Sequence, residues 1–397
     1  MQTNKRLDQL DSIRGLAATS VVLAHISILI PSSLFLDNLN KTPLHLFWLG
    51  HESVILFFVL SGFVLSLPYL NNNAPTYTTY IIRRICRILI PSCVSLIIVL
   101  ALIYLLSPNG ISSISQWGND IWRDPISISM ILNHIFLLTE FNTMTLNPVI
   151  WSLVHEMRIS ILFPFIVCLI VKGNFVKNTA IILSIPILFF VGYYVCLKLF
   201  SYDITAFSGG YSSYLLTPHY IAFFLLGALL AKFQVNMKKI YNKMTLPLKI
   251  IMLLLALILY MYNWLVLPNI AILHMFILND WAIAGGCVLF IFFGLHSSTI
   301  KNLLLLKPVH YVGKFSYSLY LYHMPTMLVS LYALQGAMPI WLILTIAFVL
   351  SFIVSAIMYH LVELPSVKLG RYLTSRNKPI RENMSNKTTV SMKNIQR

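Results

Sequence analysis

The chain has 397 residues, of which 58% are hydrophobic and only 10% are charged, and its mean hydropathy is +0.80. Soluble domains carry about a quarter charged residues, so this composition excludes a water-soluble globular protein and predicts an integral membrane protein. The net charge of +16 at pH 7 raises the possibility of a nucleic-acid partner, which the positions of the basic residues argue against. The five cysteines have no C-x-x-C spacing, which favours buried free thiols over disulfides or a metal site.

Ten segments are long and apolar enough to cross a bilayer, because a spanning helix needs about 20 mostly apolar residues. We therefore predict an all-α fold, a polytopic transmembrane helical bundle of about ten spans. Residues 1–365 are predicted to form one membrane domain, and residues 366–397 a basic, disordered tail. The longest polar segment between spans is 107–147. The predicted spans are 13–30, 48–70, 88–106, 150–171, 180–199, 214–233, 250–267, 278–296, 315–334 and 340–362.

The lysines and arginines predict the orientation, because cytoplasmic loops carry an excess of them. Ten spans put both termini on one side of the membrane, and all but four of the 28 basic residues lie on that side. We therefore predict cytoplasmic termini, and this asymmetry accounts for the net charge without any nucleic acid. The four exceptions are Lys41, Arg123, Arg158 and Lys198.

Ionisable residues inside spans are the first candidates for function, because they are costly in lipid. Arg14 and His25 lie eleven residues apart in the first span, almost three helical turns, so they share one face about 16 Å apart. Asp11 precedes Arg14 by three residues and can pair with it. By themselves these residues favour an orienting arginine and a structural histidine.

Six short motifs occur in one order across residues 11–365. Each is weak alone, but the ordered set resembles the acyltransferase 3 family of membrane acyltransferases. The resemblance makes Arg14 and His25 candidates for catalysis. The motifs are Arg14-x10-His25; FFVLSGFVL from Phe57; RRICRILIP from Arg83 to Pro91; Trp151, Ser152, Leu153 and Glu156; Gly313, Ser316, Tyr317, Tyr320, Leu321 and His323; and Glu363 with Pro365.

The resemblance implies an enzyme that moves an acyl group, usually acetyl, from cytoplasmic acetyl-CoA to a sugar hydroxyl of a cell-envelope glycan. We expect acyl-CoA as co-substrate, no metal, and a location in the bacterial inner (plasma) membrane. Some relatives carry a further extracytoplasmic domain after the last span. We expect only the membrane module here, so the carbohydrate acceptor, whether free or lipid-linked, would be handled by the spans or by a partner.

Coenzyme A carries several phosphates, which guanidinium groups recognise well. Arg14, Arg83, Arg84 and Arg87 are therefore candidates for donor binding at the cytoplasmic mouth, although the last three would also suit an orienting loop. His25 is the candidate general base, since a near-neutral histidine can take a proton from a sugar hydroxyl. We predict that phosphates bind near Arg14 and Arg87 and that the pantetheine arm reaches inward to His25.

The remaining motif residues have less defined roles. Glu156 is expected to orient His25 or bind a sugar hydroxyl, or else to pair with Arg158. Glu363 is expected in a structural ion pair. His45 and His51, six residues apart with no third ligand near, do not indicate a metal site. Candidates for substrate contact or oxyanion stabilisation, or for interhelical hydrogen bonds, are Trp151, Ser152, Ser316, Tyr317, Tyr320 and His323.

Two other function classes remain possible from the residues alone. A polytopic transporter, or a flippase for lipid-linked sugars, would also have many spans and a histidine able to relay protons. A binding or sensor protein would keep the fold without the chemistry. The acceptor glycan, the acyl chain length, the choice between direct transfer and an acyl-enzyme, and the oligomeric state are left open by the sequence.

Overall fold

The computed structural model describes residues 7–31, 33–200, 210–214, 216–265 and 276–375, and their regular structure is entirely helical. This confirms the predicted all-α class. The helices are α1 (Asp8–Leu29), α2 (Leu34–Asn40), η1 (Pro43–Trp48), α3 (Gly50–Leu70), α4 (Tyr77–Leu106), α5 (Gln116–Asp120), α6 (Ile128–Phe136), η2 (Thr143–Thr145), α7 (Ile150–Lys172), α8 (Phe175–Phe200), η4 (Gly210–Ser212), α9 (Leu216–Lys243), α10 (Leu246–Tyr260), α11 (Tyr262–Leu265), α12 (Phe276–His296), α13 (Ser298–Leu304), α14 (Lys307–Lys314), α15 (Ser316–Leu334), α16 (Ile340–Met358), η6 (Tyr359–Glu363) and α17 (Leu364–Ser375).

Seven helices among the described residues are long and apolar enough to cross a membrane. They correspond to seven of the ten predicted spans and lie in α1, α3, α4, α7, α9, α12 and the continuous segment Ile340–Ser375. The three other predicted spans correspond to α8, α10 and α15. Of these, α10 has only 15 residues, and α15 is interrupted by polar side chains. Residues 266–267 of the seventh predicted span lie outside the described residues. The count of ten and the cytoplasmic termini remain predictions.

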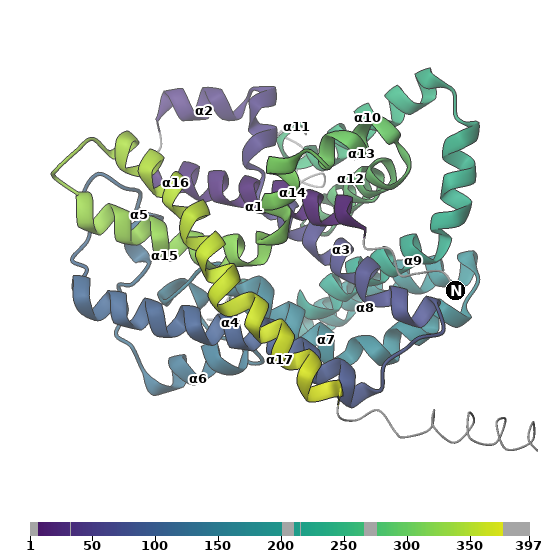
Figure 1. The fold of residues 1–397 in the computed structure, drawn as a ribbon, viewed down its shortest axis with the longest axis horizontal. Helices are drawn as coiled ribbons and strands as arrows, with labels where there is room; N and C mark the ends of the chain where they lie inside the picture. Colours follow the sequence, from purple (N-terminus) through teal and green to yellow (C-terminus); the bar gives the residue numbers. More distant parts are fainter. Residues whose placement is uncertain (1–6, 32, 201–209, 215, 266–275, 376–397) are drawn as a thin grey trace, which may run out of the picture.

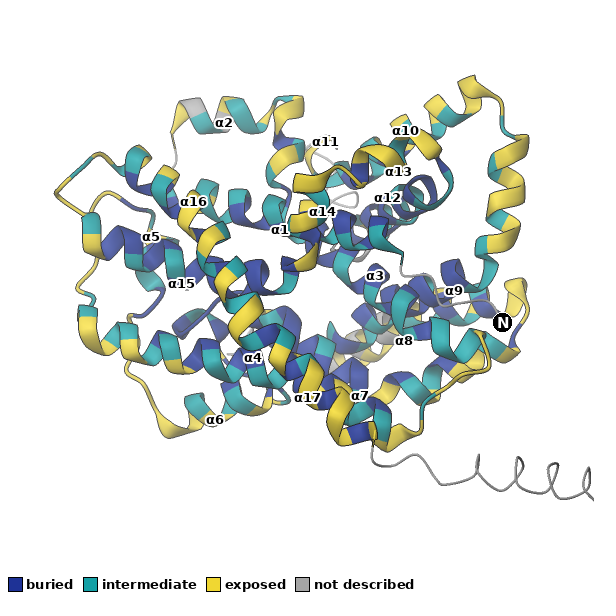
Figure 2. Cartoon of the chain, viewed as in Figure 1, coloured by how far each residue is buried: buried dark blue, intermediate teal, exposed yellow. Residues whose placement is uncertain are grey.

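Large apolar side chains cover the outer surface of the helices. On α4, Ile97 is 65% and Leu105 is 74% exposed, and α10 exposes Ile250, Ile251 and Leu254. Figure 2 shows such exposed residues along the outward faces of α10 and α16. Water does not solvate a surface of this kind favourably, whereas lipid does. The chain is therefore a multi-pass integral membrane protein.

The centre of the bundle is formed by α3 and α9, whose backbones lie in direct contact. A Cβ atom on Gly62 would lie 1.9 Å from the carbonyl oxygen of Phe224, and one on Gly227 would lie 1.9 Å from that of Val59. Small residues allow this close approach, which drives helix association in lipid. Gly62 belongs to the FFVLSGFVL motif. Its contact with the backbone of α9 gives this motif glycine a packing role.

The first ten residues of the segment predicted as a polar tail, 366–375, belong to a helix. Instead of leaving the bundle at residue 366, the chain passes through η6, a π-helical turn, and continues as α17 to Ser375. Figure 1 shows α16 and α17 as one long segment that crosses α4. Arg83 Nε donates a hydrogen bond to Thr374 Oγ1 at 2.9 Å. The small buried residues Ser366, Gly370 and Thr374 recur every four positions and give α17 a flat face for this packing. Residues 376–397 lie outside the described residues.

The contact between α3 and α9 can be tested with Gly62→Ala. The added methyl group would overlap the backbone of α9, and overpacking of this kind costs about 1–3 kcal/mol. We expect a lower midpoint of thermal unfolding in detergent, followed by tryptophan fluorescence. Gly192→Ala is the matched control, because a Cβ atom on Gly192 in α8 meets no atom within 4 Å. Equal midpoints for the two variants would contradict the close contact.

Candidate active site

Three cavities follow one another along α1 and share lining residues. The histidine cavity, of about 710 Å³, includes His25. The middle cavity, of about 90 Å³, shares Val54 and Tyr320 with it. The arginine cavity, of about 430 Å³, shares Arg14 and Arg87 with the middle cavity. The helical face that joins Arg14 to His25 therefore runs beside a series of adjoining cavities.

The arginine cavity gathers four basic side chains. Arg14, Arg87, Lys314 and Arg371 line it together with the carboxylates Asp11 and Glu363. Arg14 Nη1 lies 3.6 Å from Asp11 Oδ1, and Arg14 Nη2 donates a long hydrogen bond of 3.5 Å to the carbonyl of Leu60 on α3. Arg87 is exposed and hydrogen bonds to no other described residue. Sequence reasoning missed Arg371, because it lay in the segment expected to be a disordered tail.

The three arginines of α4 separate into three environments. Arg84 is buried, and its Nη2 donates to Glu156 Oε1 at 2.6 Å while its Nε donates to Ser160 Oγ at 2.9 Å. Arg83 points to α17 and lines neither the middle nor the arginine cavity. Of these three arginines, Arg87 alone lines both cavities. The three guanidinium groups of the basic cluster therefore do not lie together in one cavity.

Glu156 contacts neither of the two residues that were expected beside it. It forms an ion pair with Arg84 in the wall of the middle cavity. His25 lines the histidine cavity instead. Arg158 instead donates to the backbone carbonyls of Leu138, Thr139 and Ser212. The reason is helical geometry: residues two apart on α7 point to opposite sides. Glu363, expected in an ion pair, instead accepts a hydrogen bond from Ser318 Oγ at 2.6 Å.

The other motif residues line the boundary between the cavities. Tyr320 Oη lies 2.7 Å from Ser152 Oγ and 3.1 Å from the carbonyl oxygen of Val149, which fixes the Tyr320 ring where the histidine and middle cavities meet. Ser316 and Tyr317 line the middle and arginine cavities, and Tyr317 Oη donates to the carbonyl of Ile88. Trp151 lines the histidine cavity.

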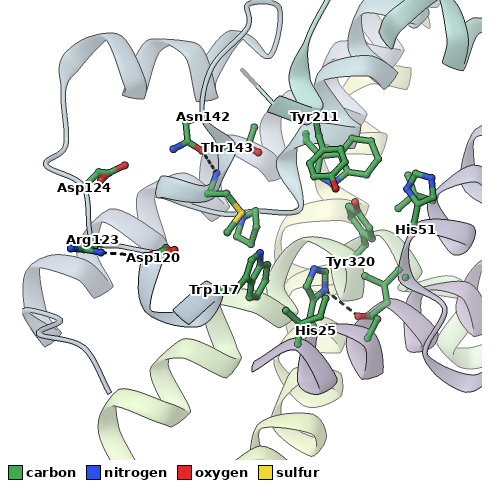
Figure 3. A pocket seen from close by; sticks show the side chains of 18 residues that line it. His25, His51, Trp117, Asp120, Arg123, Asp124, Asn142, Thr143, Tyr211 and Tyr320 are labelled. Atoms are coloured by element: carbon green, nitrogen blue, oxygen red, sulfur yellow. Dashed lines mark hydrogen bonds and ion pairs between the residues drawn. The ribbon is translucent and has the colours of Figure 1, made fainter. Parts of the chain in front are cut away.

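His25 lies at the histidine cavity and contacts a second histidine. His25 Nδ1 is 3.1 Å from the carbonyl oxygen of Val21 and 3.0 Å from His323 Nε2. His323 is fully buried, and its Nδ1 is 2.9 Å from the carbonyl oxygen of Leu319. The ring of Trp117 stacks on His25 with the ring centroids 5.6 Å apart (Figure 3). The sequence proposed both histidines without indicating that they touch.

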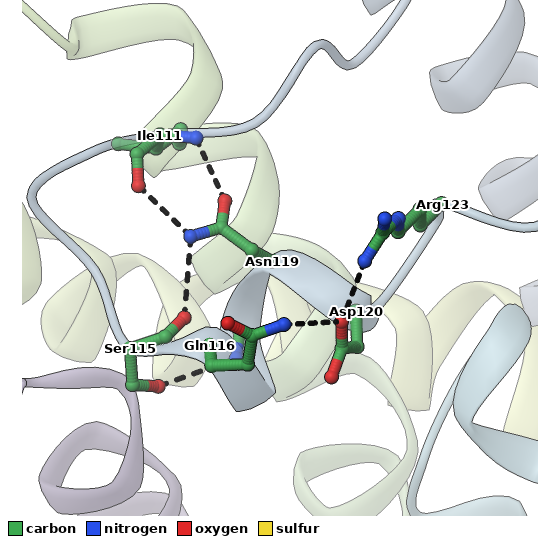
Figure 4. A network of polar contacts seen from close by, with 7 residues as sticks. Ile111, Ser115, Gln116, Asn119, Asp120 and Arg123 are labelled. Carbon is green, nitrogen blue, oxygen red and sulfur yellow. Dashed lines mark hydrogen bonds and ion pairs between the residues drawn. The ribbon is translucent and has the colours of Figure 1, made fainter.

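The segment 107–147 builds one wall of the histidine cavity. The side-chain amide of Asn119 fixes its fold by accepting from Ile111 N and donating to the carbonyls of Ile111 and Ser115 (Figure 4). The short helix α5 places Trp117 and Asp120 at the cavity. Arg123 pairs with Asp120 there, with Nη1 and Oδ1 3.3 Å apart. With Trp151 and Tyr211 opposite, the cavity combines aromatic faces with hydroxyl-binding groups.

A second polar cluster at this cavity was not predicted. His51 lines the cavity, and its Nε2 lies 2.7 Å from Asp280 Oδ1. The other oxygen of Asp280 lies 2.9 Å from Nε2 of the buried His219. The three side chains come from α3, α12 and α9. The available signal was Asp280 itself, a carboxylate inside an apolar segment.

The structure separates His45 from His51. His45 contacts Asn40 and the ring of Trp264, and burial lowers the pKa of His45 to about 4. Across the described part of the chain, no group of three or more histidine, cysteine, aspartate or glutamate side chains is arranged to hold a metal ion.

Comparison with known proteins places this site in a family. A family model described as "Acyltransferase domain" matches residues 7–360. The chain is 26% identical to proteins named O-acetyltransferase OatA from Staphylococcus aureus strains NCTC 8325 / PS 47, COL and MRSA252, over 93% of this chain. It spans only 58% of the length of these relatives. No solved structure matches the chain significantly. The match over nearly the whole helical bundle shows that the chain belongs to the acyltransferase 3 family of integral membrane acyltransferases.

Proposed function

We propose that this protein is a membrane O-acyltransferase that moves an acyl group, most simply acetyl, from acyl-CoA to a hydroxyl of a cell-envelope or surface polysaccharide. The observation that carries the proposal is the series of three cavities along α1, which links a basic cavity to His25. We place the enzyme in the bacterial inner membrane, with the arginine cavity towards the cytoplasm. Because Arg371 lines that cavity, we extend the proposed membrane domain from residue 365 to Ser375.

The arginine cavity suits the phosphates of the donor. Arg14, Arg87, Lys314 and Arg371 outnumber the two carboxylates there, and guanidinium groups form paired hydrogen bonds to phosphate oxygens. The middle cavity is small and is lined both by apolar side chains such as Phe57 and by polar ones that include the Arg84–Glu156 pair. Its size suits the thin pantetheine arm, whose amides can hydrogen bond to the polar side chains. Threading this arm through the middle cavity would bring the thioester to the His25 end of α1.

At the histidine cavity, His25 would act as a general base. It takes the proton from the acceptor hydroxyl as the hydroxyl oxygen attacks the thioester carbonyl carbon. The carbon–sulfur bond then breaks, the ester is released, and the coenzyme A thiolate takes the proton back from His25. No second acid is needed in these steps, because the proton that His25 takes from the hydroxyl is the one that the thiolate receives. Arg14 and the Arg84–Glu156 pair act at the donor end, so we assign them to donor binding and to positioning.

The acceptor would occupy the wide part of the histidine cavity. Trp117, Trp151 and Tyr211 offer flat aromatic faces, and Asp120 and Asn142 offer groups that hydrogen bond to hydroxyls. This combination of a few polar groups with aromatic walls is typical of small-molecule and sugar sites. The relatives named as O-acetyltransferases support an oxygen acceptor and an acetyl group. Possible acceptors include lipopolysaccharide O-antigen, capsule, exopolysaccharide, peptidoglycan and a glycosylated metabolite.

The proposed reaction is tested by mass spectrometry of surface glycans from cells that express the wild type, His25→Ala or no protein. We expect a mass increment of one acyl group on the glycan with the wild type only, because general-base catalysis contributes about 10²–10⁴-fold in rate.

His134→Ala is the matched control for this experiment. His134 is also buried and also contacts the carbonyl four residues earlier, but it lies outside the three cavities. It should keep the acyl increment at comparable protein level. If His25→Ala instead abolished export of the glycan and left acylation of the remainder intact, a transporter or flippase would be the better assignment.

The donor site is tested with Arg87→Gln. Hydrogen bonds to a charged group contribute about 1.5–3 kcal/mol, so we expect the KM for acetyl-CoA to rise roughly 10- to 100-fold. The measurement is acetyl transfer from radiolabelled acetyl-CoA in membrane vesicles that contain the cell's own glycans.

Arg83→Gln is the control for the donor site, since Arg83 lies one helical turn away but contacts Thr374 instead of the cavities. Its KM should stay within about twofold of the wild type. Equal effects of the two substitutions would show that the arginines act through general surface charge and not through the arginine cavity.

A further inference from the structure

The contact between His25 and His323 determines which ring nitrogens carry protons. His323 Nδ1 lies 2.9 Å from the carbonyl oxygen of Leu319. A carbonyl oxygen can only accept a hydrogen bond, so Nδ1 of a neutral His323 carries the proton. Its Nε2 is then a lone-pair acceptor, and this nitrogen lies 3.0 Å from His25 Nδ1.

The same reasoning applies to His25. Its Nδ1 faces two acceptors, the carbonyl oxygen of Val21 at 3.1 Å and His323 Nε2. A bare Nδ1 would place a lone pair against both acceptors, which is repulsive. His25 therefore carries its proton on Nδ1, and the lone pair of the neutral ring resides on Nε2. Because Trp117 stacks against the ring (Figure 3), the ring is also held in one plane.

We propose that His323 is a positioning residue that, together with the carbonyl of Val21, holds His25 in the Nδ1–H tautomer, so that Nε2 of His25 is the atom that takes the acceptor proton. The proposal rests on the proposed role of His25 in acyl transfer and adds to it a side chain that orients the ring and its reactive nitrogen. In the sequence, His323 was instead a candidate for contact with the substrate or the oxyanion.

His323 also affects the charged state of His25. When Nε2 takes a proton, His25 becomes an imidazolium whose Nδ1–H still points at the lone pair of His323 Nε2. A hydrogen bond to the charged form stabilises it. The arrangement resembles an orienting carboxylate behind a catalytic histidine, but it uses a neutral acceptor, which costs less to bury inside a membrane protein than a second charge. The helical carbonyl of Leu319 fixes the acceptor nitrogen in turn.

The tautomer can be measured without any substrate. Nitrogen-15 chemical shifts of histidine-labelled protein in lipid bilayers distinguish a protonated from an unprotonated ring nitrogen, and the His25 signals are assigned by their loss in His25→Ala. We expect a protonated Nδ1 and an unprotonated Nε2 for His25 near neutral pH. A His25 ring protonated on Nε2 would overturn the proposal, whatever the reaction of the enzyme.

Activity is then compared between His323→Gln and His323→Leu. A glutamine oxygen can accept the hydrogen bond from His25 Nδ1–H, whereas leucine fills similar space without an acceptor. We expect Leu to lower kcat about 10²–10⁴-fold with the KM for acetyl-CoA unchanged within about twofold, and Gln to restore at least a tenth of the wild-type kcat. Equal loss in both variants, with correctly folded protein, would indicate a structural role only.

These readouts separate the proposal from the proposed function. If wild-type vesicles transferred no acetyl group from acetyl-CoA, the proposed function would fail. The nitrogen-15 measurement would still decide whether His25 carries its proton on Nδ1, as the contacts with Val21 and His323 require. If acetyl transfer occurred and His323→Leu kept the wild-type kcat, the function would stand and the role of His323 would fail.

Discussion

Polar groups inside this bundle must find partners within the protein, because lipid offers no hydrogen bonds. This constraint explains the arrangement of the site. The buried Arg84 forms a close ion pair with the partly buried Glu156, and Asp280 contacts two histidines. Each pairing joins different helices, so the pairs that satisfy buried groups also fix the walls of the cavities. Removal of one partner would leave an uncompensated buried charge, which costs about 3–5 kcal/mol.

α1 connects the two ends of the proposed reaction. Its helical repeat places Arg14 and His25 on one face about 16 Å apart, and the cavities follow that face. A donor with a phosphate-rich end and a long neutral arm matches this order, in which the basic cavity lies at one end of the series and His25 at the other. The enzyme would therefore need no movement of the whole donor across the membrane, because the arm alone reaches the acceptor.

Periodic and compositional features of the sequence predicted the helical class, the membrane location and the shared face of Arg14 and His25. Pairings over long sequence distances were not predicted. Arg84 and Glu156 are 72 residues apart, and His51 and Asp280 are 229 apart, so no local period reports their contact. Arg371 was missed for a different reason: its polar neighbours indicated a tail, although the small residues of α17 recur every four positions, a pattern that favours helix packing.

The central claim is that the donor extends through the three cavities with its acyl group at His25. The most direct test is an experimental structure of the protein in lipid with a non-hydrolysable thioether analogue of acetyl-CoA. We expect phosphates against Arg14 and Arg87. We expect the acyl carbon in the histidine cavity, with room for one acceptor hydroxyl between it and His25 Nε2. An analogue bound wholly within the arginine cavity, with its acyl group remote from His25, would contradict it.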